Sequence, residues 1–283
     1  MTIRWRDLYD DARARLVDDV DARRIVERAA GIEGAAFHAE LDAPVPARAV
    51  PFFEGMVERR AAGEPLQYVL GRWGFRTLDL YVDRDVLIPR PETEGIVDIA
   101  ILELGRVAPA SGRPVVVDLG TGSGAIALSF AREVRDADVH GVDVSPAALR
   151  VARANLAGLG RDAVRVRLHE GSWYDPLPAE MRGNVHLIVS NPPYVGDDEV
   201  LPDEVADWEP VCALRAGPTG LEQIEIVVGG APTWLSRPGA LVVELAPHQA
   251  IAAADLARVA GFDEVEVRPD LAGHDRALVA RLT

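Results

Sequence analysis

The sequence lacks several features that would mark a particular class of protein. Among its 283 residues there is no lysine, so arginine and histidine supply every basic side chain. Cys212 is the only cysteine, which excludes an intrachain disulfide and a cysteine-based metal site. No stretch approaches the roughly 20 continuous apolar residues of a membrane helix, and Met1–Asp7 lacks the apolar segment of a secretory signal peptide. We therefore expect a cytoplasmic protein.

The chain is strongly acidic. It carries 45 Asp and Glu residues against 30 Arg residues, for a formal net charge of -15 at pH 7. Such a chain repels a phosphate backbone, and no basic run offsets that repulsion. The six histidines do not show the spacing of metal ligands. The composition therefore predicts no direct contact with nucleic acid or membrane, and no metal site.

Length and periodicity predict two domains. A chain of 283 residues with 48% hydrophobic residues is long for one domain and comfortable for two. Near the start, apolar residues recur at near-helical spacing in two runs, Leu8, Ala12, Leu16 and Val20, then Ile25, Ala29 and Ile32. A third helix is expected over Ala49–Ala62, ending at Gly63. We predict a helical recognition domain over residues 1–72, a hairpin linker over 73–84 and a larger domain over 85–283.

Beyond the linker, predicted strands alternate with predicted helices. Strands are expected at Arg113–Leu119, Asp138–Asp143, Val164–Leu168, Val185–Ser190 and Ala240–Leu245, with a terminal pair at Val265–Val267 and Ala277–Arg281. Helices are expected at Ala125–Arg135, Pro146–Leu156 and Gln249–Ala260. Ser145 suits the N-cap of the second helix, and Gly261 suits the end of the third. The alternation predicts an α/β fold with a doubly wound sheet, whose ligands bind beyond the carboxyl ends of its strands.

A glycine-rich loop, Asp118–Ala125, follows the first of these strands. Its glycines, Gly120, Gly122 and Gly124, let the backbone approach a ligand closely, and the helix that follows directs its N-terminus at a negative group. Asp143 ends the second strand, where an acidic side chain can hold two ribose hydroxyls. The pattern also satisfies the fingerprint of nicotinamide-dependent dehydrogenases, so the loop alone leaves two kinds of nucleoside cofactor open.

The most informative segment is Asn191–Tyr194, with the sequence Asn-Pro-Pro-Tyr, directly after the predicted buried strand Val185–Ser190. Asn191 offers a side-chain carbonyl oxygen, and Pro192 offers a backbone carbonyl whose direction is restricted by the proline that follows. Tyr194 adds a flat ring. Two acceptors beside an aromatic face suit a planar amide or amino NH2 group, for which a dehydrogenase has no evident use. The alternative is a rigid turn without a ligand.

Together, the loop Gly120–Gly124, Asp143 and Asn191–Tyr194 resemble the class I S-adenosylmethionine-dependent methyltransferases of the amino-methylating type. Three further parts of the chain resemble the peptide chain release factor glutamine N5-methyltransferase family. These are Glu64–Gly71, Leu87–Glu94, and Trp208–Pro210 with Ala213–Leu214 and Gly217–Leu221. The resemblance extends from residue 60 or so to the C-terminus and is weaker over the helical part. It implies a doubly wound, seven-stranded class I methyltransferase sheet with a small N-terminal helical domain.

The resemblance also implies roles for individual residues. The cofactor would be S-adenosyl-L-methionine, with S-adenosyl-L-homocysteine as product, held by Asp118, Gly120, Thr121, Gly122, Ser123, Gly124, Asp143, Ser172, Trp173 and Asn191. Trp173 would stack on adenine, although Ser172 is a weaker acceptor than the acidic residue that the family often has there. Arg90 and Glu92 would fix the loop over the cofactor. The substrate amide would be held by Asn191, Pro192, Pro193 and Tyr194, with Asn191, Pro192 and Tyr194 acting in catalysis.

The expected activity is methyl transfer to the side-chain amide nitrogen, N5, of the glutamine in the Gly-Gly-Gln motif of peptide chain release factors, by a monomeric enzyme. Four alternatives stay open. The chain could methylate a ribosomal-protein glutamine, the N6 of adenine in a nucleic acid or a small-molecule amide, or it could bind without catalysing. The acidic charge argues against the nucleic-acid alternative. The acidic loop 197–204 is either solvated or a contact for basic residues that flank the substrate glutamine.

Overall fold

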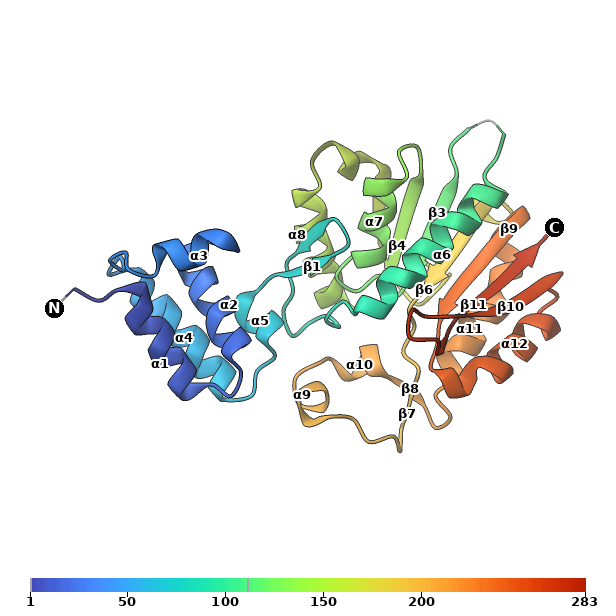
Figure 1. Cartoon of the computed structure of the whole chain (residues 1–283). Coiled ribbons are helices and arrows are strands. Elements are labelled where there is room, and N and C mark those ends of the chain that lie inside the picture. The colour runs from blue at the N-terminus through green and yellow to red at the C-terminus, as the bar shows by residue number, and fades with distance from the viewer. Residues whose placement is uncertain (1, 111) are drawn as a thin grey trace. The chain divides into compact units, whose positions relative to one another are not determined.

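The computed structural model describes residues 2–110 and 112–283, and the chain divides into two units (Figure 1). The first unit contains the chain up to Arg72 together with Pro202–Trp208. The second contains Trp73–Leu201 together with Glu209–Thr283. A short segment distant in sequence thus completes the first unit. None of the helices in the described ranges has the length and apolar character that crossing a membrane requires.

The first unit is built from helices. These are α1 (Trp5–Arg15), α2 (Asp19–Ala30), α3 (Ala35–Glu40), α4 (Ala49–Ala61), α5 (Leu66–Leu70) and α9 (Asp203–Ala206). Their apolar sides enclose a core that includes the fully buried Ile25 and Phe53. α4 follows the predicted range, and Gly63 beyond it has a φ of +90°, which glycine adopts without strain. Arg60 of α4 donates to Glu204 of α9 at 2.8 Å, which fastens the returning segment to the helices.

The run from Leu8 to Val20 is not a single helix, which corrects the prediction. α1 ends at Arg15, and the Asp18 side chain caps α2 by accepting a hydrogen bond from the Val20 backbone N–H at 2.7 Å. The apolar spacing continues across this break, but Val20 is 58% exposed and does not contribute to the core. The capping aspartate therefore starts a new helix here, although the spacing of apolar residues would allow one continuous helix.

The second unit contains a seven-stranded sheet, as the family resemblance implies. In spatial order its strands are β10 (Glu264–Pro269), β11 (Asp275–Leu282), β9 (Leu235–Glu244), β6 (Val185–Ser190), β3 (Val115–Leu119), β4 (Asp138–Asp143) and β5 (Val166–Glu170). Neighbouring strands are parallel, except that β11 pairs antiparallel with both β9 and β10. The predicted doubly wound sheet and its terminal strand pair are thus confirmed.

Short strands and helices surround this sheet. The predicted hairpin is formed by β1 (Trp73–Phe75) and β2 (Leu78–Leu80), and a second small pair by β7 (Val195–Gly196) and β8 (Arg215–Gly217). The helices are α6 (Pro91–Val107), α7 (Ala125–Glu133), α8 (Pro146–Gly158), α10 (Val211–Leu214), α11 (Glu222–Trp234) and α12 (Ala250–Val259). Ser145 caps α8 as predicted, because its hydroxyl accepts a hydrogen bond from the Ala148 N–H at 3.1 Å.

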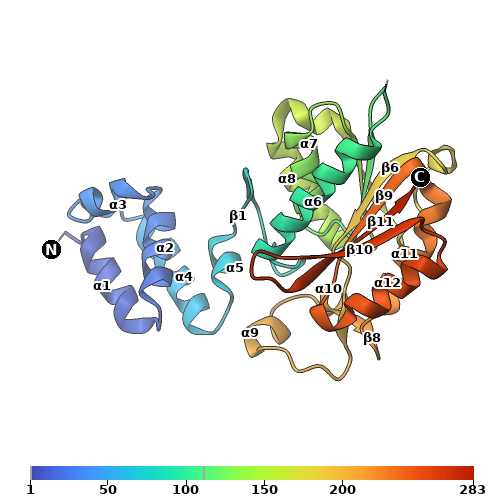
Figure 2. The ribbon, with the colours of Figure 1, turned by 45° about the vertical axis from the view of Figure 1, so that its right-hand side comes forward.

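Helices cover both faces of the sheet (Figure 2). On one face, α11 and α12 pack on strand residues such as Val117, Ile188 and Leu241, whose side chains are fully buried. α6, α7 and α8 lie on the other face (Figures 1 and 2). Because successive side chains of a strand point to opposite faces, strands covered on both sides have nearly continuous apolar sequences.

Some predicted boundaries are shifted. β5 begins at Val166 and not at Val164, because Gly160–Arg165 forms a 3-10 helix in which Arg165 donates to the Val134 carbonyl at 2.9 Å. β9 begins at Leu235, five residues before the predicted start. The strands predicted at 138–143 and 185–190 have the predicted limits.

Two long helices, α6 and α11, are absent from the predicted pattern. α6 starts beside Pro89 and Pro91, in a segment interpreted from sequence as part of a ligand loop. α11 contains Gly229, Gly230 and Pro232, residue types that disfavour the interior of a helix. Burial of one side of α11 against the sheet outweighs these local preferences.

Gly230 makes room for an aromatic side chain that supports the ligand edge of the sheet. A Cβ at Gly230 would lie 2.4 Å from a ring carbon of Tyr174. The Tyr174 ring stacks on Trp234 with 5.9 Å between centroids, and its hydroxyl donates to the Val227 carbonyl at 2.5 Å. α11 thereby fixes the turn that follows β5.

We expect Gly230→Ala to lower the free energy of unfolding by roughly 1–3 kcal/mol, the usual cost of overpacking a core. Gly229→Ala, one residue earlier in the same helix, is the matched control, because a Cβ there meets no atom within 4 Å. It introduces a better helix former and should raise stability by about 0.5–1 kcal/mol. Urea unfolding followed by circular dichroism compares the three chains. Equal stability of the two variants would contradict this account of Gly230.

Candidate active site

The strands β3 and β6 are neighbours in the sheet and end at the same edge. Leu119 and Ser190, their last residues, are register partners, and the Ser190 hydroxyl donates to the Leu119 carbonyl at 2.7 Å. From β3 the chain continues outward to β4 and β5 on one side of the sheet, and it then returns to form β6 on the other side of β3. The strand order therefore reverses between β3 and β6. The glycine-rich loop and Asn191–Tyr194 therefore begin side by side.

The glycine-rich loop is held by a buried carboxylate. Gly120 and Gly122 have φ angles of +75° and +55°, in the left-handed region that favours glycine. Asp118 accepts hydrogen bonds from the Thr121 hydroxyl at 2.6 Å and from the Ala127 N–H at 3.0 Å, both through Oδ2. Burial raises the pKa of Asp118 to about 7. Asp118 thus joins the loop to the first turn of α7.

Asp143, at the end of β4, lies beside this loop. Its Oδ2 accepts a hydrogen bond from the Gly122 N–H at 2.8 Å, and its Oδ1 accepts one from the Ser145 N–H at 2.9 Å. Burial raises the pKa of Asp143. Each carboxylate oxygen has a second lone pair, so both can still accept a hydrogen bond from a hydroxyl group.

Trp173 lies in the turn after β5. A Cβ built on Gly120 would lie 3.7 Å from the indole ring of Trp173, so this ring packs close to the glycine-rich loop. The indole N–H donates to the Gln223 side chain at 3.1 Å, which fixes the plane of the ring. Trp173 has a φ of +45°, an uncommon value for a non-glycine residue, and the next residue, Tyr174, is anchored by the hydrogen bond to Val227.

The Asn191 carboxamide is anchored through its nitrogen. Its Nδ2 donates to the Thr93 hydroxyl at 3.1 Å, and that hydroxyl donates to Oε2 of Glu244 at 2.7 Å. The Tyr194 hydroxyl donates to Oε1 of Glu244 at 3.5 Å. The buried Gln249 side chain donates to the Tyr194 carbonyl at 2.8 Å and thereby holds the end of the segment. The nitrogen of Asn191 is therefore occupied by a protein partner, and its Oδ1 is left to accept a hydrogen bond.

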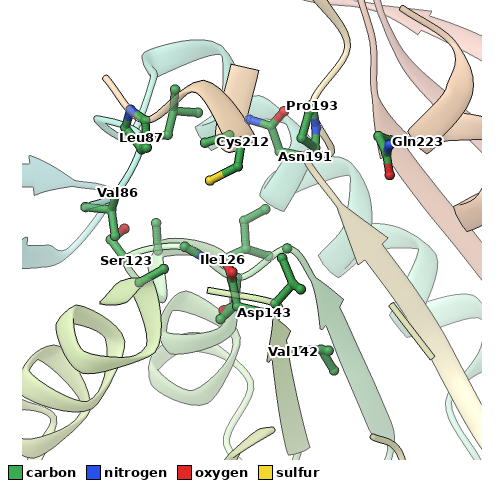
Figure 3. A pocket seen from close by; sticks show the side chains of 18 of the residues that line it. Val86, Leu87, Ser123, Ile126, Val142, Asp143, Asn191, Pro193, Cys212 and Gln223 are labelled. Carbon is green, nitrogen blue, oxygen red and sulfur yellow. Dashed lines mark hydrogen bonds between the residues drawn. The ribbon is translucent and has the colours of Figure 1, made fainter. Parts of the chain in front are cut away.

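A cavity of about 360 Å³ lies at this edge of the second unit (Figure 3). Asn191 and Cys212 lie on one side of it, and Ser123 and Asp143 lie on the opposite side (Figure 3). Of the predicted site residues, those in its wall are Gly120, Thr121, Gly122, Ser123, Asp143, Ser172, Trp173, Asn191 and Pro193. Asp118, Gly124, Pro192 and Tyr194 are not among the wall residues of the described chain.

Some wall residues were not predicted. These include Thr93, Cys212, Arg215 and Gln223. Thr93 lies within Leu87–Glu94, where the family resemblance assigns it no role, whereas Cys212 and Arg215 lie outside the residues that carry the resemblance. Gln223 has no sequence signal, because it lies in a helix that was not predicted. In the described residues, no group of three or more His, Cys, Asp or Glu side chains could hold a metal ion.

Comparison with known proteins identifies the family. The family model for the methyltransferase small domain matches residues 95–206, and the model for the PrmC N-terminal domain matches residues 8–71. The release factor glutamine methyltransferase of Cereibacter sphaeroides is 40% identical over 267 residues, covering 93% of this chain and 90% of that protein. That of Deinococcus radiodurans is 39% identical over 287 residues, covering 98% of each.

The chain belongs to the release factor glutamine methyltransferase family.

Solved structures agree on the fold alone. The catalytic domain of human Mettl16, in complex with an RNA hairpin, has a TM-score of 0.56 at 12% identity and covers 84% of this chain and 82% of its own. A methyltransferase from Pyrococcus furiosus has a TM-score of 0.52 at 17% identity and covers 83% of this chain and 97% of its own. The class I methyltransferase fold implied by the sequence is thus confirmed.

Two segments that carry the family resemblance are joined by one carboxylate. Glu209 accepts hydrogen bonds from the Ile88 N–H at 3.2 Å and from the Arg90 guanidinium, and its side chain is 1% exposed. Arg90 and Pro210 both belong to the cavity wall. The buried carboxylate therefore holds the segment before α6 against the segment that follows β7. The expectation that Arg90 and Glu92 fix the loop over the cofactor stays a prediction.

The cavity wall suits the methyl donor that the resemblance implies. The donor's adenosine would need acceptors for two ribose hydroxyls and a flat surface for adenine. Asp143 supplies two carboxylate oxygens, and Trp173 supplies an indole ring. The left-handed Gly120 and Gly122 leave the backbone of the loop open to close approach. The residues present therefore fit this group.

Proposed function

We propose that this chain transfers a methyl group from S-adenosyl-L-methionine to the side-chain amide nitrogen, N5, of the glutamine in the Gly-Gly-Gln motif of peptide chain release factors. We further propose that it acts as a cytoplasmic monomer without direct contact to nucleic acid. The supporting observation is the anchored carboxamide of Asn191, in the wall of the cavity and beside the glycine-rich loop. The relatives' name, release factor glutamine methyltransferase, supports a glutamine of a release factor as the substrate.

The cofactor half of the cavity is assigned to the residues beside β3, β4 and β5. Asp143 accepts hydrogen bonds from the ribose hydroxyls, and Trp173 stacks on adenine. Ser172 and the loop Gly120–Gly124 complete that half, while Asp118 holds the loop from behind. When bound, S-adenosyl-L-methionine supplies a methyl group on a positively charged sulfonium, which is a strong electrophile with a good leaving group.

The substrate half is assigned to Asn191–Tyr194. A glutamine amide nitrogen is a poor nucleophile because its lone pair is delocalised into the carbonyl. Asn191 Oδ1 and the Pro192 carbonyl accept its two hydrogens, which orients the nitrogen and stabilises the positive charge that develops on it. Pro193 restricts the direction of the Pro192 carbonyl, and the Tyr194 ring packs on the amide plane. Such alignment is worth several kcal/mol of the barrier.

The chain needs no strong general base for this transfer. The amide nitrogen becomes acidic once it is methylated, and it loses a proton to water. Burial raises the pKa of Tyr194 to about 12, so its hydroxyl stays protonated at neutral pH. Tyr194 is therefore assigned a packing role, not the role of a base.

We expect Asn191→Ala to lower turnover by roughly 10²-fold or more, as for loss of one preorganised polar contact. Cofactor affinity should stay nearly unchanged, because the acceptor acts on the substrate amide. Asn184→Ala is the matched control, since Asn184 is an exposed asparagine just before β6. Turnover and calorimetric affinity are measured on the same preparations. Unchanged turnover of Asn191→Ala would reject the acceptor role.

Asp143→Ala should weaken cofactor binding by roughly 1–3 kcal/mol, the scale of a hydrogen bond to a charged group. The physical reason is the loss of both oxygens assigned to the ribose. Asp136→Ala, an exposed aspartate before β4, serves as the control. Isothermal titration calorimetry measures both variants, and equal affinity for the cofactor would exclude this role of Asp143.

The activity itself is tested with labelled cofactor and purified release factor. The parallel substrates are the same factor with the glutamine of its Gly-Gly-Gln motif changed to alanine, and a duplex DNA. Label on the unmodified factor alone, located at that glutamine by mass spectrometry, is the expected result. Measurable cofactor binding with no label on the factor would overturn the assignment of the substrate and would favour a small-molecule or ribosomal-protein amide.

A further inference from the structure

We propose that Thr93 and Glu244 are positioning residues that determine which way the Asn191 carboxamide faces, so that its oxygen and not its nitrogen meets the substrate amide. This inference rests on the proposed function and deepens it. It concerns the side chain of Thr93, in the first turn of α6, and that of Glu244, at the end of β9. Neither has been assigned a role in the transfer.

The two residues form a buried relay of hydrogen bonds behind Asn191. Thr93 is 4% exposed and Glu244 is 1% exposed. Asn191 Nδ2 lies 3.1 Å from the Thr93 hydroxyl, which lies 2.7 Å from Oε2 of Glu244. The backbones of these residues are fixed by α6, β9 and the end of β6. The relay is therefore a rigid feature of the second unit.

The relay has a direction because a hydroxyl has a single hydrogen. An ionised Glu244 can only accept, so Thr93 donates its hydrogen to the carboxylate. The Thr93 oxygen is then left as an acceptor, and only the nitrogen end of the Asn191 carboxamide can donate to it. This directs Oδ1 of Asn191 away from Thr93. A carboxamide rotated by half a turn would instead present N–H groups to the N–H groups of the substrate, which repel.

Protonation of Glu244 would reverse the direction of these hydrogen bonds. A carboxylic acid can donate to Thr93, whose own hydrogen could then turn toward Asn191 and select the carboxamide oxygen as its partner. Burial raises the pKa of Glu244 to about 7. The charged and titratable groups that face it are Arg276 of β11, which lowers this pKa, Glu92 of α6, which raises it, and Tyr194, whose hydroxyl lowers it. The correct orientation is thus favoured above neutral pH and lost below it.

The first test reads the orientation without any turnover. The chain contains only three asparagines, Asn155, Asn184 and Asn191. Labelling with 15N-asparagine therefore gives three side-chain NH2 signals in an NMR spectrum, and Asn191→Ala assigns one of them. In Thr93→Val the Asn191 signal should move and exchange with water several-fold faster. The other two are internal controls, because both donate to backbone carbonyls elsewhere. An unmoved Asn191 signal would overturn the relay.

The second test is kinetic. Thr93→Val should lower turnover about tenfold, the scale of one orienting hydrogen bond, while the affinity for cofactor and the melting temperature show that the site is otherwise intact. Thr93→Ser retains a hydroxyl and should recover most of that loss. Leu102→Ala is the surface control, because Leu102 is 64% exposed on the same helix. Wild-type turnover in Thr93→Val, or equal loss in Thr93→Val and Thr93→Ser, would reject the proposal.

The third test, the pH dependence of turnover, does not depend on whether Thr93→Val folds. In the unaltered chain, turnover at saturating cofactor should rise with pH through an inflection near neutrality. Glu244→Gln cannot ionise, so its turnover above neutral pH should stay at the low level that the unaltered chain shows below neutral pH. Full turnover of Glu244→Gln at high pH would overturn the role of Glu244. Failure of the proposed function is distinguishable, because the unaltered chain would then transfer no label to release factor at any pH.

Discussion

The pairing of β3 with β6 is the constraint on which the site depends. The two strands are far apart in sequence, yet Leu119 and Ser190 end them at the same level of the sheet. Apart from Asn191, the residues assigned to the cofactor follow β3, β4 and β5, and the residues assigned to the amide follow β6. A shift of β6 by one residue against β3 would turn the side chains of β6 to the opposite face of the sheet and displace the segment that follows it.

Buried polar side chains then hold each loop in place before any ligand binds. Asp118 secures the glycine-rich loop, Glu209 secures the segment before α6, and Gln249 secures the end of Asn191–Tyr194. All three are nearly inaccessible to solvent, so their hydrogen bonds are costly to break. The site is therefore largely preorganised, which is what a reaction governed by alignment requires.

Sequence predicts those parts of this structure that depend on local pattern. The limits of the strand at 185–190 follow from a mostly apolar run. The two ligand loops follow from the order of their glycine, proline and asparagine residues. α11 was missed because its Gly and Pro residues oppose a helix that only packing stabilises. The hydrogen bond between Thr93 and Glu244 joins residues 151 positions apart, and no sequence pattern of neighbouring residues predicts a contact over such a separation. The roles assigned to individual site residues stay predictions.

The return of Pro202–Trp208 to the helical unit has a consequence for the evolution and engineering of this chain. The polypeptide passes between the two units three times, after Arg72, Leu201 and Trp208. The helical unit is therefore not a detachable module at the N-terminus. A truncated chain starting at Trp73 would keep α9 while losing Arg60, its ionic partner. Exchange of recognition domains between relatives would have to include this short internal segment, so the two units are expected to change together.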